Sequence, residues 1–230
     1  MSDTENNPRK NLIDDLVADL KPVQRPGRVG FSMAIWLLAA VAYSLTIMLA
    51  TGPLRPDALS HLIEHPWFAL ETLVAAATIT LACFAALALT IPGRGNPRKL
   101  LAIPLVLLGG WLTFYLVGLV APAHPVSMDG KRDHCVLQGI LFSLPNLVAL
   151  LALARRYYPV WPRATAAAAG LASAAIPAAL MQFGCMYAPD HILTHHMAPI
   201  LATVALGAII GPWVLSPRRP VPRGPAAPLH

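Results

Sequence analysis

Two cysteines and three histidines are the residues of this sequence whose types and spacing could support metal or redox chemistry. Cys135 begins one apolar segment, Cys185 follows another, and His134 directly precedes Cys135. His191 and His195 are four residues apart, so an α-helix would place both on one face. Thiolates and imidazoles bind soft metal ions, thiols react with oxidants, and paired thiols form disulfides in oxidising compartments. The residues alone leave open a structural disulfide, a soft-metal site and redox-reactive thiols.

Motifs of enzymatic chemistry are missing from the sequence. It has no CxxC or HExxH pattern, which would indicate a redox or zinc active site. It has no Ser-His-Asp set or paired glutamates that would suggest hydrolysis. We therefore expect no enzymatic activity and no cofactor, with a soft metal ion acting as a signal as the one candidate ligand. Cys83, inside an apolar segment, is expected to be a small packing residue.

The elements that must position these residues are membrane-spanning helices. Hydrophobic residues make up 56% of the 230 residues and charged residues 12%, against about 25% charged in a typical soluble domain. Six segments have the length of about 20 residues that a span requires, and they must be helical because lipid offers the backbone no hydrogen-bond partner. The expected spans are Val29–Ala50, Phe68–Ile91, Leu100–Ala121, Cys135–Ala154, Ala164–Phe183 and Met197–Leu215. The sequence predicts an all-α, polytopic membrane protein, a six-helix bundle with short loops.

The distribution of basic residues predicts the orientation of this bundle. Fourteen of the 17 Lys and Arg residues fall in the terminal segments and in the second and fourth linkers, which predicts that both termini are cytoplasmic. The expected organisation is a cytoplasmic N-terminal segment (1–28), a transmembrane domain (29–215) and a basic cytoplasmic tail (216–230). Cys135, Cys185 and seven of the eight histidines then lie on the outer side. The basic residues are scattered over short linkers, so we expect no direct contact with nucleic acid.

Two features inside the spans add expectations about packing. The fifth span contains the small-residue run AAAAGLASAAIPAAL at 166–180, and membrane helices approach each other closely through small residues. We expect it to be the most closely packed helix. Glu71 is the one charged residue within the spans. It lies about one turn from the outer edge, where we expect it to reach water.

The segment before the first span has the pattern of an amphipathic helix. Its apolar side chains recur at helical spacing, while its acidic side chains occupy the other faces. The apolar set is Leu12, Ile13, Leu16, Val17 and Leu20, and the acidic set is Asp14, Asp15 and Asp19. Such a short helix is marginal alone in water, and its acidic face would be repelled by anionic lipid. We therefore predict that it docks into a protein groove lined by basic residues.

Several stretches together resemble the NrsF-type family of integral-membrane anti-sigma factors. The resemblance rests on NLIDDLVADLKPVQRPG at 11–27, HPWFALETLVAAAT at 65–78, TIPGRGNPRK at 90–99, HCVLQGILFSLPNLVALLALAR at 134–155 and QFGCMYAPDH at 182–191. It implies a multi-pass protein of the bacterial inner membrane that holds an extracytoplasmic-function (ECF) sigma factor and releases it on heavy-metal or oxidative stress. The family's periplasmic cysteine pair would correspond to Cys135 and Cys185, and its sigma contact to residues 11–21.

Two other functions remain open at the level of sequence. A small metal-handling transporter could capture an ion with the outer histidines and cysteines, but it would need a path of ionisable groups across the membrane, and none is evident. A membrane thiol-disulfide oxidoreductase could cycle a Cys135–Cys185 disulfide, but no CxxC supports it.

Overall fold

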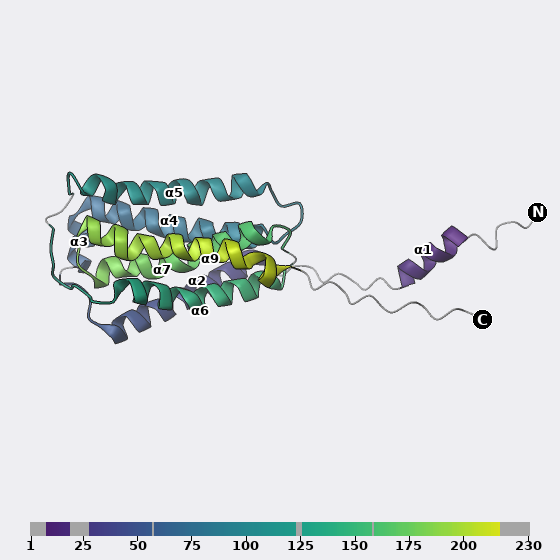
Figure 1. Cartoon of the computed structure of the whole chain (residues 1–230), viewed down its shortest axis with the longest axis horizontal. Helices are drawn as coiled ribbons and strands as arrows, with labels where there is room; N and C mark the ends of the chain where they lie inside the picture. Colours follow the sequence, from purple (N-terminus) through teal and green to yellow (C-terminus); the bar gives the residue numbers. More distant parts are fainter. Residues whose placement is uncertain (1–7, 19–27, 57, 123–125, 158, 217–230) are drawn as a thin grey trace, which may run out of the picture.

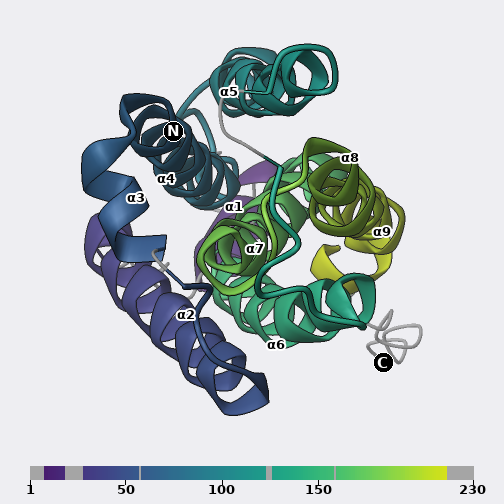
Figure 2. The same ribbon diagram turned by 90° about the vertical axis from the view of Figure 1, so that its left-hand side faces the viewer.

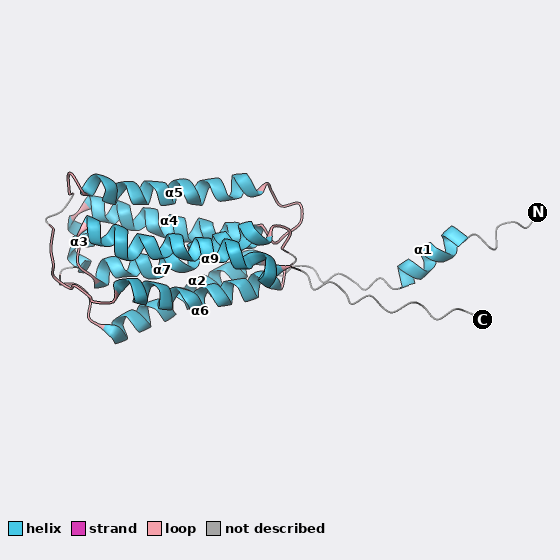
Figure 3. Ribbon diagram, viewed as in Figure 1, coloured by secondary structure: helices cyan, strands magenta, loops and turns pink. Residues whose placement is uncertain are grey.

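Every regular element in the described part of the chain is a helix (Figures 1 and 3). The computed structural model describes residues 8–18, 28–56, 58–122, 126–157 and 159–216. Five long apolar helices are α2 (Val29–Thr51), α4 (Pro66–Ala88), α5 (Pro97–Gly118), α6 (Cys135–Arg155) and α7 (Pro162–Gly184). A sixth apolar stretch runs through α8 (Pro189–His191), the π-helix η1 (Ile192–Met197) and α9 (Ala198–Leu215). All six are long and apolar enough to cross a membrane, which confirms the expected fold class.

Prolines explain where several of these helices begin. Proline occupies the first turn of α4, α5, α7 and α8, where its missing N–H costs nothing and its fixed φ suits the helix. At α5 the Asn96 side chain also accepts a hydrogen bond of 2.9 Å from the Arg98 amide. The expected spans therefore start two or three residues too late at Pro66 and Pro97. The last span begins at Pro189 rather than at Met197.

Two short helices lie outside the spans. The amphipathic segment forms α1 (Pro8–Ala18), and α3 (Ala58–Glu64) follows α2. Figure 1 shows α1 standing apart from the bundle, on the side where α2 begins and α9 ends. We call this side the terminal end of the bundle. At the opposite side, the distal end, α2 and α7 finish and α6 begins.

Helix α7 forms the centre of the bundle. The end-on view shows it enclosed by α2, α4, α6 and α9 (Figure 2), and 78% of its most apolar stretch is buried. The outer helices keep large apolar side chains exposed, among them Leu38 (73%), Val106 (72%) and Trp213 (77%), a surface suited to lipid. The expectation that the small-residue span is the most closely packed helix is confirmed.

Glycines allow α7 and α9 to approach closely. A Cβ added at Gly170 of α7 would lie 2.6 Å from the Thr203 carbonyl oxygen and 3.0 Å from the Val204 Cα, both in α9. On α9, added Cβ atoms at Gly207 and Gly211 would meet backbone atoms of α7. These contacts are with backbone, which cannot rotate away as a side chain could. The two helices are therefore interlocked through their main chains.

We predict that Gly170→Ala destabilises the protein by about 1–3 kcal/mol, the usual cost of overpacking a close contact. The measurement is reversible denaturation of the purified protein in detergent. Gly109→Ala is the matched control, because a Cβ at Gly109 in the exposed part of α5 meets nothing within 4 Å. Equal effects of the two substitutions would contradict the close α7–α9 contact.

Candidate functional site

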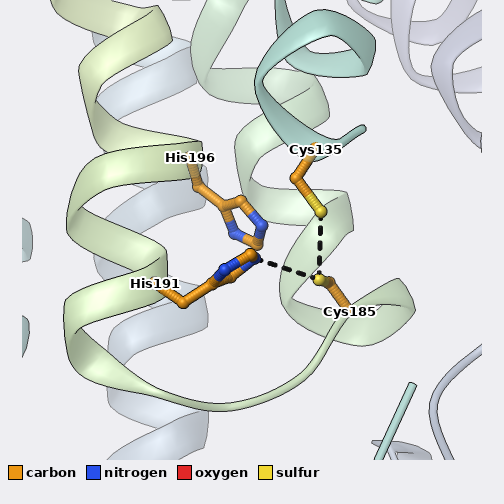
Figure 4. Close-up of side chains that lie close together, drawn as sticks. All are labelled: Cys135, Cys185, His191 and His196. Carbon is orange, nitrogen blue, oxygen red and sulfur yellow. Dashed lines mark hydrogen bonds between the residues drawn. The ribbon is translucent and has the colours of Figure 1, made fainter. Parts of the chain in front are cut away.

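Four side chains converge in a buried group at the distal end of the bundle. They are Cys135 at the start of α6, Cys185 directly after α7, His191 at the end of α8 and His196 in η1. Taking one ligand atom from each residue, a sulfur or a ring nitrogen, all four atoms lie within 4.8 Å of one another, and all four residues are buried. Figure 4 shows the two sulfurs facing the two imidazole rings. We call this group the Cys2His2 cluster.

The cluster brings together the two cysteines that the sequence places at the same side of the membrane. Their Sγ atoms are 3.2 Å apart as free thiols, and the Cys185 Sγ is 3.4 Å from Nε2 of His191. The Cys135 thiol hydrogen bonds to the Cys185 sulfur and lowers the pKa of Cys185, while burial acts in the opposite direction. The pair is therefore close enough for joint ligation or for oxidation.

The π-helix η1 decides which histidine joins His191 in the cluster. The i→i+5 bonding of this π-helix brings residue i+5 as well as residue i+4 beside residue i. His191 therefore has both His195 and His196 as ring neighbours, and His196 is the one that offers a ligand atom near the sulfurs. His195 stacks on His191, with ring centroids 4.2 Å apart, as the four-residue spacing predicts, but it is not among the clustered residues. Its Nδ1 lies 2.7 Å from the Thr194 hydroxyl.

The structure does not bring His134, another residue that the sequence singles out, into the cluster. His134 is exposed at the N-cap of α6 and is not among the clustered residues. At an N-cap the chain is only entering the helix, so adjacency to Cys135 in sequence does not place the imidazole beside its sulfur. The sequence offered no signal for His196 beyond the paired histidines, because the choice depends on the backbone of η1.

His196 is an unusual histidine for a membrane-protein interior. Its side chain is 2% exposed. Neither ring nitrogen has a hydrogen-bond partner among the residues that the structure describes. Buried polar atoms are nearly always hydrogen-bonded. Within the described chain the two nitrogens of His196 are not, and the ring faces two sulfurs. This arrangement is typical of a position where a ligand binds.

Arg132 connects the cluster to two helix ends. Its guanidinium donates to the carbonyls of Met48 (3.2 Å) and Pro53 (2.8 Å) around the end of α2, and to the Gly184 carbonyl (2.7 Å) at the end of α7. The same group also donates to the Thr51 hydroxyl. Its own carbonyl lies 3.4 Å from the Cys135 sulfur. One residue therefore links α2, α7 and the start of α6 beside the cluster.

A second polar group lies nearby, and it corrects the expectation for Glu71. Glu71 of α4 is 1% exposed and does not reach water. The Tyr115 hydroxyl of α5 donates to its carboxylate, and Gln182 of α7 and Trp111 of α5 both donate to Tyr115. The proximity of Glu71 to the outer edge led to the wrong expectation, because neighbouring helices cover that face and supply the partners instead.

The positively charged Arg55 lies near the buried carboxylate of Glu71. Arg55 follows α2 and is 5% exposed. Its guanidinium lies 5.6 Å from the ring centroid of Phe68 and 5.8 Å from that of Tyr187. Burial raises the pKa of Tyr187, the negative charge of Glu71 raises it further and Arg55 opposes this rise. The loop that carries Cys185 is thus anchored to α4 through a neutral tyrosine.

Helix α1 presents its apolar stripe to the outside. Leu12, Ile13, Leu16 and Val17 are between 58% and 61% exposed, and Asp14 and Asp15 are exposed as well. Asp19 and Leu20, the last members of the predicted docking surface, lie outside the described residues. The helix that the sequence predicts here is confirmed, and no described element covers its apolar side chains.

The comparison with protein families decides the affiliation of the chain. A family model described as NrsF, negative regulator of sigma F, matches residues 16–216. The chain belongs to the NrsF family. No curated protein and no solved structure matches it. The resemblance seen in the sequence is thereby confirmed, and membership implies negative regulation of a sigma factor.

The match gives the NrsF assignment a definite extent. It begins within α1 and ends just after α9, so it takes in all six apolar spans, the Cys2His2 cluster and Arg132. Leu12, Ile13, Asp14 and Asp15 precede the matched range. The features of the distal end therefore belong to the part of the chain that is assigned to the family.

We predict that Arg132→Ala in this NrsF protein lowers the free energy of unfolding by about 2–4 kcal/mol, because it leaves several carbonyls without their charged donor. Thermal and chemical denaturation in detergent measure the change. Lys131→Ala is the matched control, since Lys131 is the exposed neighbour and should have little effect. An Arg132 variant as stable as the Lys131 variant would show that these hydrogen bonds do not hold the helix ends.

Proposed function

We propose that this NrsF protein is an inner-membrane anti-sigma factor of the bacterial stress response. It sequesters an ECF-type sigma factor through α1 and releases it when the Cys135–Cys185 pair senses periplasmic heavy-metal or oxidative stress. Family membership over residues 16–216 carries the proposal. The exposed stripe of α1 and the paired thiols support its two finer parts, the sigma contact and the sensor.

The physical state of α1 supports a protein partner on this helix. An isolated helix of 11 residues is marginal in water, and α1 leaves four large apolar side chains uncovered. Full burial of each such side chain contributes roughly 1.5–3 kcal/mol, so a groove in a partner would stabilise the helix. Asp14 and Asp15 favour a groove lined by basic residues over an anionic membrane. A sigma factor, which contacts DNA, offers basic surface of this kind.

The distribution of Lys and Arg residues supports the orientation in the membrane that the proposed mechanism requires. Of the 17 Lys and Arg residues, only Arg55, Lys131 and Arg132 belong to the linkers of the distal end. The excess of basic residues at the terminal end favours a cytoplasmic position for that end. This orientation places α1 with the transcription machinery and the Cys2His2 cluster at the periplasmic side.

A route between the two ends is available along α2. Arg132 holds the distal end of α2, and α2 is the first helix after α1 in the chain. A change at Cys135 shifts the backbone that carries Arg132, because the Cys135 thiol donates a hydrogen bond to the Arg132 carbonyl three residues earlier in the chain. Release then requires that the two states of the bundle present α1 with different affinities for sigma factor.

We predict that Leu12→Asp combined with Leu16→Asp frees the sigma factor by placing charge in the buried stripe. The matched control combines Asn11→Asp and Ala18→Asp, which add the same charges on the opposite face of α1. Each ECF-type sigma factor of the source organism is expressed in turn with the full chain, and its membrane-bound fraction is measured. The stripe variant should retain at least tenfold less sigma factor than the control.

Two results of that experiment would contradict the sigma contact. One is retention of no ECF-type sigma factor by the unaltered chain. The other is equal retention by the stripe variant and the opposite-face control, which would show that α1 is not the docking surface.

We predict that Cys135→Ala and Cys185→Ala each remove the response of sigma-dependent transcription to metal or oxidant, so that the induced-to-basal ratio falls to about one. The reason is that each sensing chemistry requires both sulfurs, whether ligation or disulfide formation. Cys83→Ala is the matched control, since Cys83 is equally buried but lies in α4 away from the cluster. A normal response of the double Cys135/Cys185 variant would refute the sensor.

A further inference from the structure

We propose that the Cys2His2 cluster is a four-coordinate site for a divalent metal ion of the zinc class, occupied by Zn²⁺ or its softer congener Cd²⁺. Its ligands are Sγ of Cys135, Sγ of Cys185 and one ring nitrogen each of His191 and His196. The inference deepens the proposed function by naming the chemistry of its sensor. The metal site itself requires no sigma factor, so the two can be tested separately.

The spacing of the four residues supports tetrahedral coordination. Zinc binds sulfur at about 2.3 Å and imidazole nitrogen at about 2.0–2.1 Å in tetrahedral sites. These bond lengths place neighbouring ligand atoms roughly 3.3–3.8 Å apart. The sulfur–sulfur distance of 3.2 Å and the Cys185–His191 distance of 3.4 Å are close to this range. No pair in the cluster exceeds 4.8 Å, so small side-chain rotations would complete the site.

The chemistry of the ligand set selects the class of ion. Two sulfurs and two imidazoles in tetrahedral arrangement are typical of zinc, while hard ions such as Mg²⁺ and Ca²⁺ require oxygen ligands. Each thiol that still carries a proton loses it to solvent as it binds. Two thiolates then balance the charge of a divalent ion, and both histidines bind as neutral rings. The loaded site is electrically neutral, as its buried position requires.

The histidines distinguish this site from a simple disulfide. A disulfide would use only the sulfurs and would leave His196 buried with two nitrogens that lack hydrogen-bond partners among the described residues. The π-helix η1 aims that ring at the sulfurs, and π-helices occur frequently at functional sites. A metal ion gives one of these nitrogens a partner. Metal ligation and a Cys135–Cys185 disulfide exclude each other, since both use the same two sulfurs.

His195 completes the surroundings of the site without entering it. Its ring stacks on that of His191 with an interplanar angle of 13°, and its Nδ1 lies within hydrogen-bond distance of the Thr194 hydroxyl. His195 offers no ligand atom to the four-residue group, so it provides a matched control for His196.

The site would join three parts of the bundle. Its ligands come from the start of α6, the segment after α7 and the α8–η1 stretch that leads into α9. Binding would hold these segments at one centre, directly beside the Arg132 contacts with α2 and α7. If the proposed function holds, occupancy of this centre is the event that changes the affinity for sigma factor.

Cobalt provides the direct test, because tetrahedral Co²⁺ reports its ligands by colour. The full-length protein in detergent is reduced, freed of metal and titrated with Co²⁺ under anaerobic conditions. We expect one equivalent to give the intense visible bands of a tetrahedral complex with thiolate-to-cobalt charge transfer. One equivalent of Zn²⁺ or Cd²⁺ should abolish them. Native mass spectrometry should show one added zinc and the loss of two protons relative to the reduced neutral-thiol form.

Single variants assign the ligands. His196→Ala should weaken Co²⁺ binding at least a hundredfold, whereas His195→Ala should leave the tetrahedral bands in place with less than a tenfold loss. His196→Cys keeps a metal ligand at this position, so it should retain binding and intensify the charge-transfer band. This variant tests the position even if His196→Ala fails to fold, which size-exclusion chromatography detects.

Three results would overturn the proposal: no stoichiometric Co²⁺ binding by the folded reduced protein, octahedral spectra without thiolate bands, or loss of binding in His195→Ala but not in His196→Ala. Retention of sigma factor is measured on the same preparations. If the unaltered protein binds no metal but still retains sigma factor, only the metal assignment is refuted. Tight metal binding without retention of any sigma factor would refute only the proposed function.

Discussion

Lipid supplies no hydrogen bonds to the backbone, and this constraint governs most of the structure. Within the described chain it is met by helices along the spans and, at the distal end, by Arg132. A helix leaves its last carbonyls without intrahelical partners, and the Arg132 guanidinium binds those of Met48 and Gly184. Gly52 and Gly184 make this possible, because a Cβ on either would lie within 3.3 Å of the guanidinium. The Cys2His2 cluster lies directly beside this arrangement.

The Cys2His2 cluster and α1, to which we assign sensing and sigma binding in our proposal, lie at opposite ends of a tightly packed bundle. The cluster joins segments before and after the central helix α7, and α1 lies beyond the terminal end with its apolar stripe uncovered. The buried contacts of Glu71, Tyr115 and Gln182 tie α4, α5 and α7 together near the cluster. A bundle interlocked in this way responds to a local change by shifting whole helices, since close-packed interiors do not deform continuously.

The sequence predicts the six spans, the close packing of α7 and the amphipathic α1, because hydrophobic length, small-residue content and helical periodicity depend on local residue types. Topology places Cys135 and Cys185 at the same side of the membrane, but their contact depends on the packing of α6 against α7. His196 could not be predicted in place of His195, since their roles depend on a single π-helical turn. The burial of Glu71 and the contacts of Arg132 depend on which helices lie side by side, and span prediction carries no such information.

The π-helix η1 (Ile192–Met197) shifts the register of the final span by one residue relative to a continuous α-helix. Converting its wide turn into an ordinary α-helical one would rotate His191 relative to α9 by about 100° and would turn its imidazole away from the Cys185 sulfur that it now faces. Because glycines hold α9 in close contact with α7, α9 would stay in place. The segments that would rotate are α8 and the loop that carries Cys185. The arrangement of the Cys2His2 cluster therefore depends on the register of η1, and a shift of one residue along this helix would separate its four side chains.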